Sequence, residues 1–371
     1  MKAGIVTFVD YTNYGNRLQN YAVSEIFQSL GYETYTIDMY QISNPLKRIL
    51  KVIMQDNMYL VYLKFRQLLD KNLERERKVR FIEFTHAFMK KKNIVYNKEL
   101  PFNLQDKFDY FLAGSDQIWN PYFGGNPEYF LTFVPKEKRI ACIASIGVIE
   151  LPDAVKTNYK EWISQMHYIS VREESAAKLI KDLTGREVES FLDPTLLLER
   201  KEWEKLSKKP KVKIPERYIL TFFLGEEPQK WIEHYAQNDT LSVISMEHKD
   251  CPEYYVFDPA EFLYLISHAE RILTDSFHAA AFSLKFRKQV NVFRRQQKSH
   301  KDMFTRIDNL LTKFGIQDCY REWEYQESNA MEEKGISKEQ FDQMEQEMKK
   351  ERKRFENSMK RELNNEIEQV K

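Results

Sequence analysis

The feature that most constrains the fold is an alternation of short apolar runs with amphipathic helical segments, which begins at the N-terminus. Residues 3–9 (AGIVTFV) form a continuous apolar run, a helical pattern follows over 17–30, and a second extended run (YETYTID) comes after Gly31. Apolar runs of this length are typical of buried strands, and a glycine directly after a helical pattern frequently ends the helix. A strand, a helix and a strand in this order predict a β-α-β unit, the building block of a parallel sheet.

The same alternation continues along the chain and predicts two separate sheets. Further strands are expected in the first half over residues 108–114, 139–148, 167–173 and 187–194. Strands are expected in the second half over residues 218–225, 241–246, 271–275 and 289–293. A chain of 371 residues exceeds the size at which one hydrophobic core usually stops growing. We therefore predict two α/β domains of Rossmann-like type, over residues 1–198 and 199–325.

Two segments depart from this alternation. From Leu46 to about Lys92, apolar and basic residues at helical spacing predict a helical insertion over about 45–95 in the first domain. The tail over 326–371 places apolar residues at helical spacing among lysines and glutamates, and it predicts one long amphipathic helix. A single apolar stripe of this kind favours packing or self-association over catalysis.

The charge balance excludes a strong overall attraction to nucleic acid or to anionic membranes. The chain has 57 Lys and Arg against 56 Asp and Glu, a formal net charge of +1. Cys142, Cys251 and Cys319 are isolated, which argues against a disulfide framework or a zinc site. The first apolar run meets Asp10 at once, too early for a signal peptide, and no later run approaches the roughly 18 residues that span a bilayer. We therefore expect a cytoplasmic protein.

Candidate functional residues follow the predicted strands, at the edge where parallel α/β sheets bind ligands. After the first strand, Gly15 permits a tight turn and Asn16 is placed to cap the next helix, whose free N–H groups suit an anion. A plain capped helix start explains this loop equally well. After a later strand, Ser115 and Asp116 open a loop with more hydrogen-bonding side chains than a cap requires. We expect Ser115 and Asp116 to contact substrate.

Two further strand ends carry an arginine and a histidine. Arg172 has either a structural partner such as Glu173 or the carboxylate or phosphate of a ligand. Asp275 and Ser276 stand where a strand becomes a helix, with Ser276 as a candidate cap and His278 in the first helical turn. The helix dipole disfavours a protonated imidazole there, but a bound phosphate would reverse this effect. His278 is therefore a candidate general acid.

Several cofactor and metal motifs are absent from the sequence. No Gly-x-Gly-x-x-Gly follows a strand, and neither a Walker A nor a His-Glu-x-x-His pattern occurs. We therefore expect the protein to need neither a nicotinamide cofactor nor a metal ion, and we expect no nucleic-acid partner.

In their order and spacing, these loops resemble the polysaccharide pyruvyl transferase family. The matching pieces are NYGNRLQNYA, GSDQIWN, ISVREE, LDPTLLL and TDSFH, and the resemblance covers about residues 3–315. It implies a GT-B-like fold, in which two Rossmann-like domains face a cleft. It also implies a transferase that moves the enolpyruvyl group of phosphoenolpyruvate onto a sugar of a surface polysaccharide precursor, such as an exopolysaccharide or capsule, to form a pyruvate ketal.

The resemblance implies roles for individual residues. His278 matches the family's histidine and would be the general acid. Arg172 matches the arginine expected to hold the donor, and Asp116 would orient or deprotonate a sugar hydroxyl. Asn16 with Ser276 would bind donor or acceptor.

The sequence departs from the family pattern beside this histidine. The family tends to carry an arginine two residues before it, where this chain has Ser276, and often a glycine after it, where this chain has Ala279. The resemblance therefore implies that another cation replaces the missing arginine. Arg294, Arg295 and Arg306 follow in the sequence and are candidates.

Other functions stay open from the sequence. One is a GT-B-type glycosyltransferase that uses a nucleotide sugar, because a fold does not fix its chemistry. Another is a non-catalytic relative that binds sugar or phosphate. For a pyruvyl transferase, the acceptor would be lipid-linked or nucleotide-linked. The basic helical region over 46–92 either approaches an anionic membrane or is a solvated packing helix, and the tail offers a surface for a homo-oligomer.

Overall fold

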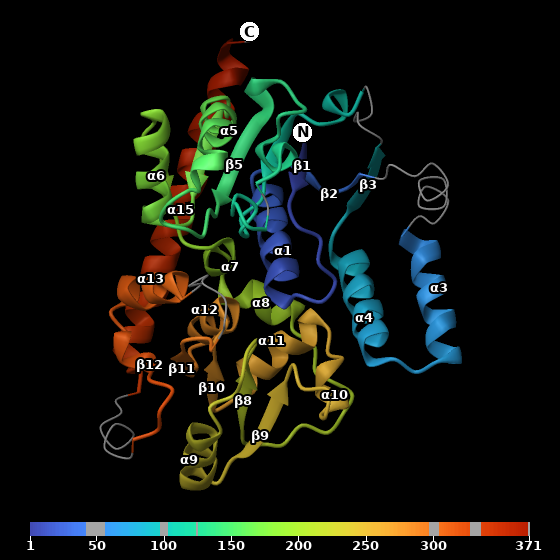
Figure 1. The fold of residues 1–371 in the computed structure, drawn as a ribbon, viewed down its shortest axis with the longest axis vertical. Helices are drawn as coiled ribbons and strands as arrows, with labels where there is room; N and C mark the ends of the chain where they lie inside the picture. Colours follow the sequence, from blue (N-terminus) through green and yellow to red (C-terminus); the bar gives the residue numbers. More distant parts are fainter. Residues whose placement is uncertain (42–55, 97–102, 124, 297–303, 327–334, 370–371) are drawn as a thin grey trace. The chain divides into compact units, whose positions relative to one another are not determined.

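The computed structural model describes residues 1–41, 56–96, 103–123, 125–296, 304–326 and 335–369 (Figure 1). The chain divides into two compact units, here called the first unit (Met1–Leu198 with Lys350–Lys371) and the second unit (Glu199–Lys349). Each unit holds one parallel sheet, which confirms the predicted α/β class with two Rossmann-like domains. Each unit is described by itself, so the predicted cleft between them stays a prediction.

The sheet of the first unit has the strand order β3-β2-β1-β4-β5-β6-β7, and all neighbours are parallel. Its strands are β1 (Lys2–Val6), β2 (Glu33–Gln41), β3 (Lys91–Tyr96), β4 (Tyr110–Ala113), β5 (Arg139–Ala144), β6 (Tyr168–Val171) and β7 (Glu189–Ser190). The chain moves outward from β1 to β3, returns to place β4 beside β1, and continues to β7. The strand order therefore reverses between β1 and β4.

The sheet of the second unit has the order β12-β11-β10-β8-β9, again with parallel neighbours. Its strands are β8 (Tyr218–Phe222), β9 (Ser242–Met246), β10 (Arg271–Thr274), β11 (Gln289–Phe293) and β12 (Tyr320–Arg321). Here the strand order reverses between β8 and β10.

Helices connect the strands in both units. The first unit contains α1 (Tyr14–Ser29), α3 (Asp56–Leu69), α4 (Leu73–Phe88), α5 (Asp153–Ser164), α6 (Glu174–Thr184) and α7 (Pro194–Leu197). The second contains α8 (Arg200–Leu206), α9 (Gln229–Asp239), α10 (Pro252–Tyr255), α11 (Pro259–His268), α12 (Phe277–Lys285) and α13 (Thr305–Phe314). Short 3-10 turns cover Gln105–Lys107, Pro127–Phe130, Lys136–Lys138 and Gln317–Cys319. Of the described helices, not one is both long enough and apolar enough to cross a membrane.

Two details of the predicted elements are wrong. The predicted helical insertion over about 45–95 contains the helices α3 and α4, but its last part is strand β3. The lysines of β3 (KKNIVY) resembled the basic face of a helix in the sequence. The part of the insertion before residue 56 lies outside the described residues. Helix α1 is capped by Asn13, because its side chain accepts a hydrogen bond from the Asn16 N–H at 3.0 Å. Asn16 therefore lies inside the helix.

The core of the first unit anchors one of the polar loops. Strands β4 and β5 are buried along their whole length, as expected for a parallel sheet covered on both faces. The loop after β4 ends in Trp119, whose ring stacks on Phe130 with centroids 4.9 Å apart. The Trp119 indole donates to the Tyr129 carbonyl, and Tyr159 donates to the Trp119 carbonyl, each at 2.9 Å. The far end of this loop is therefore fixed.

The tail forms one long helix, α15 (Lys338–Gln369), which starts in the second unit and continues in the first from Lys350 onward. In the first unit, Phe355 is fully buried and meets the Phe191 ring edge-on at 5.2 Å. Ser358 donates to Glu189 at 2.7 Å, and the Arg354 guanidinium lies over the Phe191 ring. This part of the apolar stripe packs within the chain, which is one of the two predicted roles of the tail.

We predict that Phe355→Ala destabilises the first unit. The substitution leaves a cavity between α15 and β7, which costs about 3–5 kcal/mol of unfolding free energy. Urea-induced unfolding followed by circular dichroism measures the loss. Lys353→Ala, on the exposed face of the same helix, is the matched control and should change the unfolding free energy by less than about 0.5 kcal/mol. Equal transitions for the two variants would show that the helix is not part of this core.

Candidate functional site

Polar side chains gather in each unit where the strand order reverses. Parallel α/β sheets bind ligands at the carboxyl ends of the strands, in the crevice that such a reversal leaves. The first unit contains four predicted site residues: Ser115, Asp116 and Arg172 follow strand ends, and Asn16 lies in the first turn of α1. The second unit contains the other four: Asp275 and Ser276 follow β10, His278 lies in the first turn of α12, and Arg306 lies in α13.

Asn16 and Asp116 meet at the β1/β4 reversal. The Asn16 amide donates to the Asp116 carboxylate at 3.2 Å. The Arg17 guanidinium holds the other end of that amide, because its Nη2 donates to Asn16 Oδ1 at 2.6 Å. Arg17 Nη2 also donates to the Phe8 carbonyl at 2.5 Å. Three consecutive contacts therefore connect the loop after β1 to the loop after β4, and they fix the orientation of the Asn16 amide.

Arg17 is a fully buried cation, with 0% of its surface exposed. Within the described chain it forms no ion pair with a carboxylate, and its Nη1 has no hydrogen-bond partner. Burial lowers the pKa of Arg17, while the charges of Tyr11, Asp38, Asp10 and Asp116 oppose that shift. The guanidinium is therefore balanced by nearby charges and not by direct pairing.

Two buried hydroxyls at the ends of β1 and β4 also lack partners among the described residues. Ser115 is 0% exposed and Thr7 is 4% exposed. Neither hydroxyl has a hydrogen-bond partner among the residues that the structure describes. Both follow the strands that flank the reversal, and a Cβ on Gly114 would lie 2.8 Å from the Thr7 Cβ, so only glycine fits between them. With Arg17 Nη1, three buried donors near the β1/β4 reversal are therefore unsatisfied by the described residues.

Arg172 is bound by protein carboxylates. Its Nη1 donates to Asp193 at 2.6 Å, its Nε to Glu173 at 3.3 Å, and its Nη2 to the Ser145 hydroxyl at 3.1 Å. Burial lowers the pKa of Arg172, but the charges of Asp193 and Glu173 outweigh it and raise the pKa overall. Asp193 also caps α7 by accepting from Thr195 N at 2.9 Å. The structural partner that the sequence allowed for Arg172 is therefore present.

Asp275 closes the β8/β10 reversal of the second unit. Its carboxylate accepts from the backbone N–H of Leu224 at 2.8 Å and of Gly225 at 3.1 Å. Arg295 Nε donates to the same carboxylate at 2.8 Å. A Cβ on Gly225 would lie 3.0 Å from Arg295 Cγ, so a larger residue here would push the Arg295 side chain away. Asp275 therefore connects the loop after β8 to Arg295, which follows β11. The ion pair with Asp275 neutralises the charge of Arg295.

Ser276 and His278 begin helix α12. Ser276 occupies the cap position, but its hydroxyl makes no capping hydrogen bond, so its predicted capping role is wrong. Its backbone N–H donates instead to the Thr274 hydroxyl at 2.9 Å. The buried His278 ring meets Phe277 edge-on at 5.2 Å, and the Arg306 guanidinium lies 5.6 Å from the centroid of the Phe277 ring. Arg306 therefore brings a cation to the first turn of α12.

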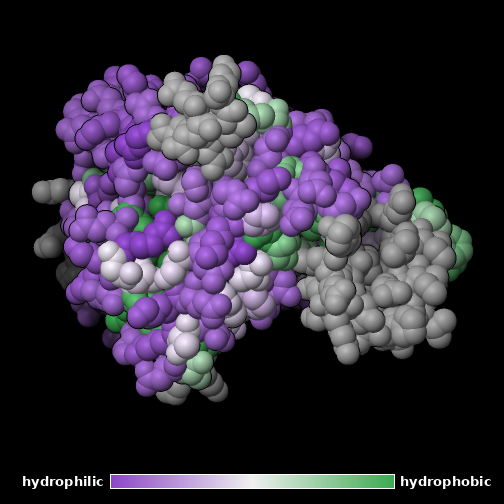
Figure 2. Space-filling view, turned by 90° about the horizontal axis from the view of Figure 1, so that it is seen from above, coloured by the Kyte–Doolittle hydropathy of each residue, from purple (hydrophilic) through white to green (hydrophobic). Residues whose placement is uncertain are grey.

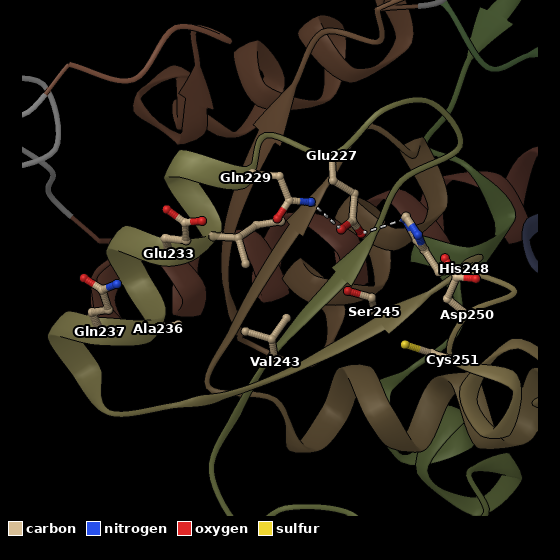
Figure 3. Close-up of a pocket in the computed structure, with 11 residues that line it drawn as sticks. Glu227, Gln229, Glu233, Ala236, Gln237, Val243, Ser245, His248, Asp250 and Cys251 are labelled. Atoms are coloured by element: carbon tan, nitrogen blue, oxygen red, sulfur yellow. Dashed lines mark hydrogen bonds and ion pairs between the residues drawn. The ribbon is translucent and has the colours of Figure 1, made fainter.

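A cavity of about 430 Å³ lies between α9 and β9 in the second unit (Figure 3). Glu227 is its buried acidic group, and it accepts from the Thr221 hydroxyl at 2.6 Å. His248 Nε2 lies 3.4 Å from the same carboxylate oxygen, and both side chains point into the cavity. The lining includes three carboxylates and no lysine or arginine. No predicted site residue lines this cavity.

The sequence reasoning missed Arg17, Thr7 and Glu227. Arg17 follows Asn16 directly within NYGNRLQNYA, but an arginine in a helical pattern normally faces solvent. Glu227 stands just beyond Gly225, and this glycine at the end of a strand was the available signal for that loop. Within the described residues, no group of three or more His, Cys, Asp or Glu could hold a metal ion.

Several solved structures align with the chain at low similarity. The UDP-GlcNAc 2-epimerase from Methanocaldococcus jannaschii is 11% identical, with 94% of this chain and 93% of that chain covered and a TM-score of 0.44. A putative UDP-N-acetylglucosamine 2-epimerase from Listeria monocytogenes is 10% identical, with coverages of 93% and 90% and a TM-score of 0.47. The glycosyltransferase VinC in complex with dTDP is 8% identical, with coverages of 98% and 99% and a TM-score of 0.40. TM-scores below 0.5 do not establish a common fold, so the two-sheet architecture rests on the topology above.

The family comparison is specific, although no curated protein sequence matches the chain. The family described as "Polysaccharide pyruvyl transferase" matches residues 13–297. This range includes the loops after β4, β6 and β10, and the helix α1 that carries Asn16 and Arg17. It spans more than half of the 371 residues and includes β4, β8 and β10, whereas β1 precedes it. The chain therefore belongs to the polysaccharide pyruvyl transferase family, whose members are transferases.

Proposed function

We propose that the protein transfers the enolpyruvyl group of phosphoenolpyruvate onto two hydroxyls of a sugar, as a step in surface polysaccharide biosynthesis. The observation that carries this proposal is the position of His278. It lies in the first turn of α12, at the carboxyl end of β10 and beside a serine hydroxyl that makes no capping bond. In a member of this family, that setting suits an acid which acts next to a bound anion.

The reaction needs one acid and one base. His278 gives a proton to the methylene carbon of phosphoenolpyruvate, and the oxygen of the first sugar hydroxyl bonds to the neighbouring carbon while Asp116 accepts its proton. The bond from that carbon to the phosphate oxygen then breaks, and its electron pair leaves with phosphate. The second hydroxyl bonds to the same carbon, and its proton restores His278. The proton on Asp116 leaves with the phosphate, so the products are the ketal and inorganic phosphate.

The start of α12 supports the donor-binding part of this proposal. Phosphoenolpyruvate carries a carboxylate and a phosphate, and a helix N-terminus attracts anions. Ser276 and the nearby Arg306 supply a hydroxyl and a cation. The cavity between α9 and β9 is unsuited to the donor, because its three carboxylates would repel a multiply charged anion. We therefore assign the donor to α12 and the replacement cation to Arg306.

Arg172 has a different part in the proposal from direct donor binding. Its donors already engage Asp193, Glu173 and the Ser145 hydroxyl. A guanidinium held by two buried carboxylates keeps the ends of β5, β6 and β7 together. We propose that Arg172 supports the acidic edge of the first unit.

The acceptor would be a lipid-linked or nucleotide-linked sugar, and the exposed face of α3 supports a lipid-linked one. Six large apolar side chains recur along this face every three or four residues: Met58, Val61, Tyr62, Phe65, Leu68 and Leu69. Leu68 is 85% exposed, and Figure 2 shows apolar surface at the right-hand edge, where Figure 1 places α3. Between residues 57 and 69 the only charged residues are the cations Lys64 and Arg66. An apolar face flanked by cations suits the surface of an anionic bilayer.

We predict that His278→Gln abolishes phosphate release while the protein stays folded. Glutamine retains a hydrogen-bonding side chain of similar size but cannot act as an acid at neutral pH. The measurement is phosphate released from phosphoenolpyruvate in the presence of lipid-linked and nucleotide-linked sugars. His268→Gln, on the exposed end of α11, is the matched control and should retain full activity.

Release of a nucleotide from a nucleotide sugar, without phosphoenolpyruvate, would indicate glycosyl transfer instead. Donor binding without turnover would indicate a non-catalytic relative.

We predict that Arg172→Ala lowers the unfolding free energy of the first unit by about 3–5 kcal/mol, because it leaves Asp193 and Glu173 as uncompensated buried carboxylates. Urea unfolding of the purified variant measures this. Arg200→Ala, which removes an exposed guanidinium, is the control and should have almost no effect. If Arg172→Ala kept its stability and lost only phosphoenolpyruvate binding, Arg172 would hold the donor directly.

We predict that Leu68→Ser with Leu69→Ser weakens binding to anionic vesicles at least tenfold. Each serine removes buried apolar area at the bilayer interface. Co-sedimentation with phosphatidylcholine vesicles, with and without phosphatidylglycerol, measures binding. Ile149→Ser, at an exposed apolar residue on another loop, is the control and should bind as the unchanged protein does. If the double variant bound vesicles normally but converted a dimer into a monomer, α3 would be a self-association surface.

A further inference from the structure

The β1/β4 crevice of the first unit contains buried hydrogen-bond donors that the folded chain does not use. They are the Thr7 hydroxyl, the Ser115 hydroxyl and Arg17 Nη1, each without a partner in the described part of the chain. Buried polar groups are nearly always hydrogen-bonded, and leaving one unsatisfied costs about 1–3 kcal/mol. Three such groups in one crevice therefore indicate that something other than the chain satisfies them.

A series of hydrogen bonds connects the chain neighbours of Thr7 and Ser115 with Arg17. Gly114 N donates to the Val6 carbonyl at 2.9 Å, which places Thr7 beside the residues that open the next loop. Arg17 donates to the Phe8 carbonyl, directly after Thr7. Arg17 also reaches Asp116 through Asn16. Asp116 is partly exposed, while the three donors are buried, so solvent reaches this set at Asp116.

The charges around the crevice favour a neutral ligand. Asp10, Asp38 and Asp116 act on Arg17, and Lys91 adds one further cation by pairing with Asp38 at 2.7 Å. Arg172 also acts on Asp116, but it is paired with two carboxylates of its own, so carboxylates still outnumber cations. This excess of negative charge disfavours a phosphate or carboxylate ligand. A sugar hydroxyl both donates and accepts, so it can donate a hydrogen bond to Asp116 and accept hydrogen bonds from Arg17, Ser115 and Thr7.

We infer that this crevice binds the neutral hydroxyl groups of a sugar, and that Arg17, Thr7 and Ser115 are its binding residues. The inference rests on the proposed function in taking that sugar to be the acceptor. It assigns the acceptor hydroxyls to the first unit, whereas the anionic donor is assigned to α12 of the second. Arg17 has two parts: it holds the Asn16 amide against Asp116, and its Nη1 is available to a hydroxyl oxygen.

The first test uses thermal stability, because an unused buried hydroxyl destabilises the free protein. Thr7→Val keeps the shape of the side chain and removes the unsatisfied group, so the melting temperature should rise by about 1 °C or more. Thr36→Val is the matched control on β2, since the Thr36 hydroxyl is buried and accepts from Asn20 Nδ2 at 2.9 Å. Its melting temperature should fall. A fall for Thr7→Val as well would show that Thr7 has a structural partner, which overturns the inference.

The second test measures sugar binding directly. The probes are the methyl glycosides of glucose, galactose and mannose, observed by saturation-transfer NMR with the full-length protein. At least one glycoside should bind, and Thr7→Val, Ser115→Ala and Arg17→Lys should each weaken that binding about tenfold or more. The Thr36→Val protein should bind the same glycoside unchanged. Binding of none of the glycosides, or equal binding by the unchanged protein and the three variants, overturns the inference.

A parallel titration with phosphoenolpyruvate separates this inference from the proposed function. The three variants should bind phosphoenolpyruvate as the unchanged protein does, because its site is assigned to α12. Loss of phosphoenolpyruvate binding in Arg17→Lys would overturn the inference and make Arg17 the missing donor cation. Glycoside binding that depends on Thr7, in a protein that does not bind phosphoenolpyruvate, would support the crevice and refute pyruvyl transfer.

Discussion

The chemistry of each unit depends on one feature of its parallel sheet, the pair of neighbouring strands between which the strand order reverses. Connections leave these two strands in opposite directions, so the carboxyl ends of the pair are not covered by a common crossover. The two reversals differ in how their buried polar groups are satisfied. Between β8 and β10, Asp275 satisfies two backbone N–H groups and pairs with Arg295, which makes a rigid platform for α12. Between β1 and β4, buried donors have no partner within the part of the chain that the structure describes. The protein itself satisfies the polar groups at the β8/β10 reversal, whereas the inferred sugar ligand would satisfy those at the β1/β4 reversal.

Much of the architecture could be predicted because burial on both faces of a parallel sheet requires continuous apolar runs. The exception was β3, where the lysines of KKNIVY concealed an edge strand. The loops that carry Asn16, Asp116 and His278 were predicted from strand ends, which sequence patterns mark well. Pairings across the sheet could not be predicted, because Arg172 meets Asp193 from a different strand end, 21 residues along the chain. The fully buried Arg17 could not be predicted either, since arginine in a helical pattern favours solvent.

The contrast between Arg17 and Arg172 shows how one residue type can serve two purposes. Arg172 has two carboxylates within ion-pair distance, so its charge is used inside the protein. Arg17 lies among aspartates that act on it from a distance, and one of its nitrogens has no partner in the described chain. The ion pairs of Arg172 stabilise the fold. The unused nitrogen of Arg17 remains a hydrogen-bond donor for a ligand, and its burial costs folding stability. Strained or unsatisfied groups of this kind concentrate at sites where function requires them.

The path of α15 has a consequence for how the protein forms during synthesis. Phe355 fills the core of the first unit against Phe191, a residue that leaves the ribosome 164 positions earlier. The core of the sheet that is translated first is therefore completed only when Phe355 has been synthesised. The contact between Phe355 and Phe191 closes a long loop of chain, and such closure is slow. Until then, the apolar surface next to β7 stays exposed and can form non-native contacts. The domain that is translated first is thus among the last to be completed, and a nascent chain stalled before residue 355 would leave it open.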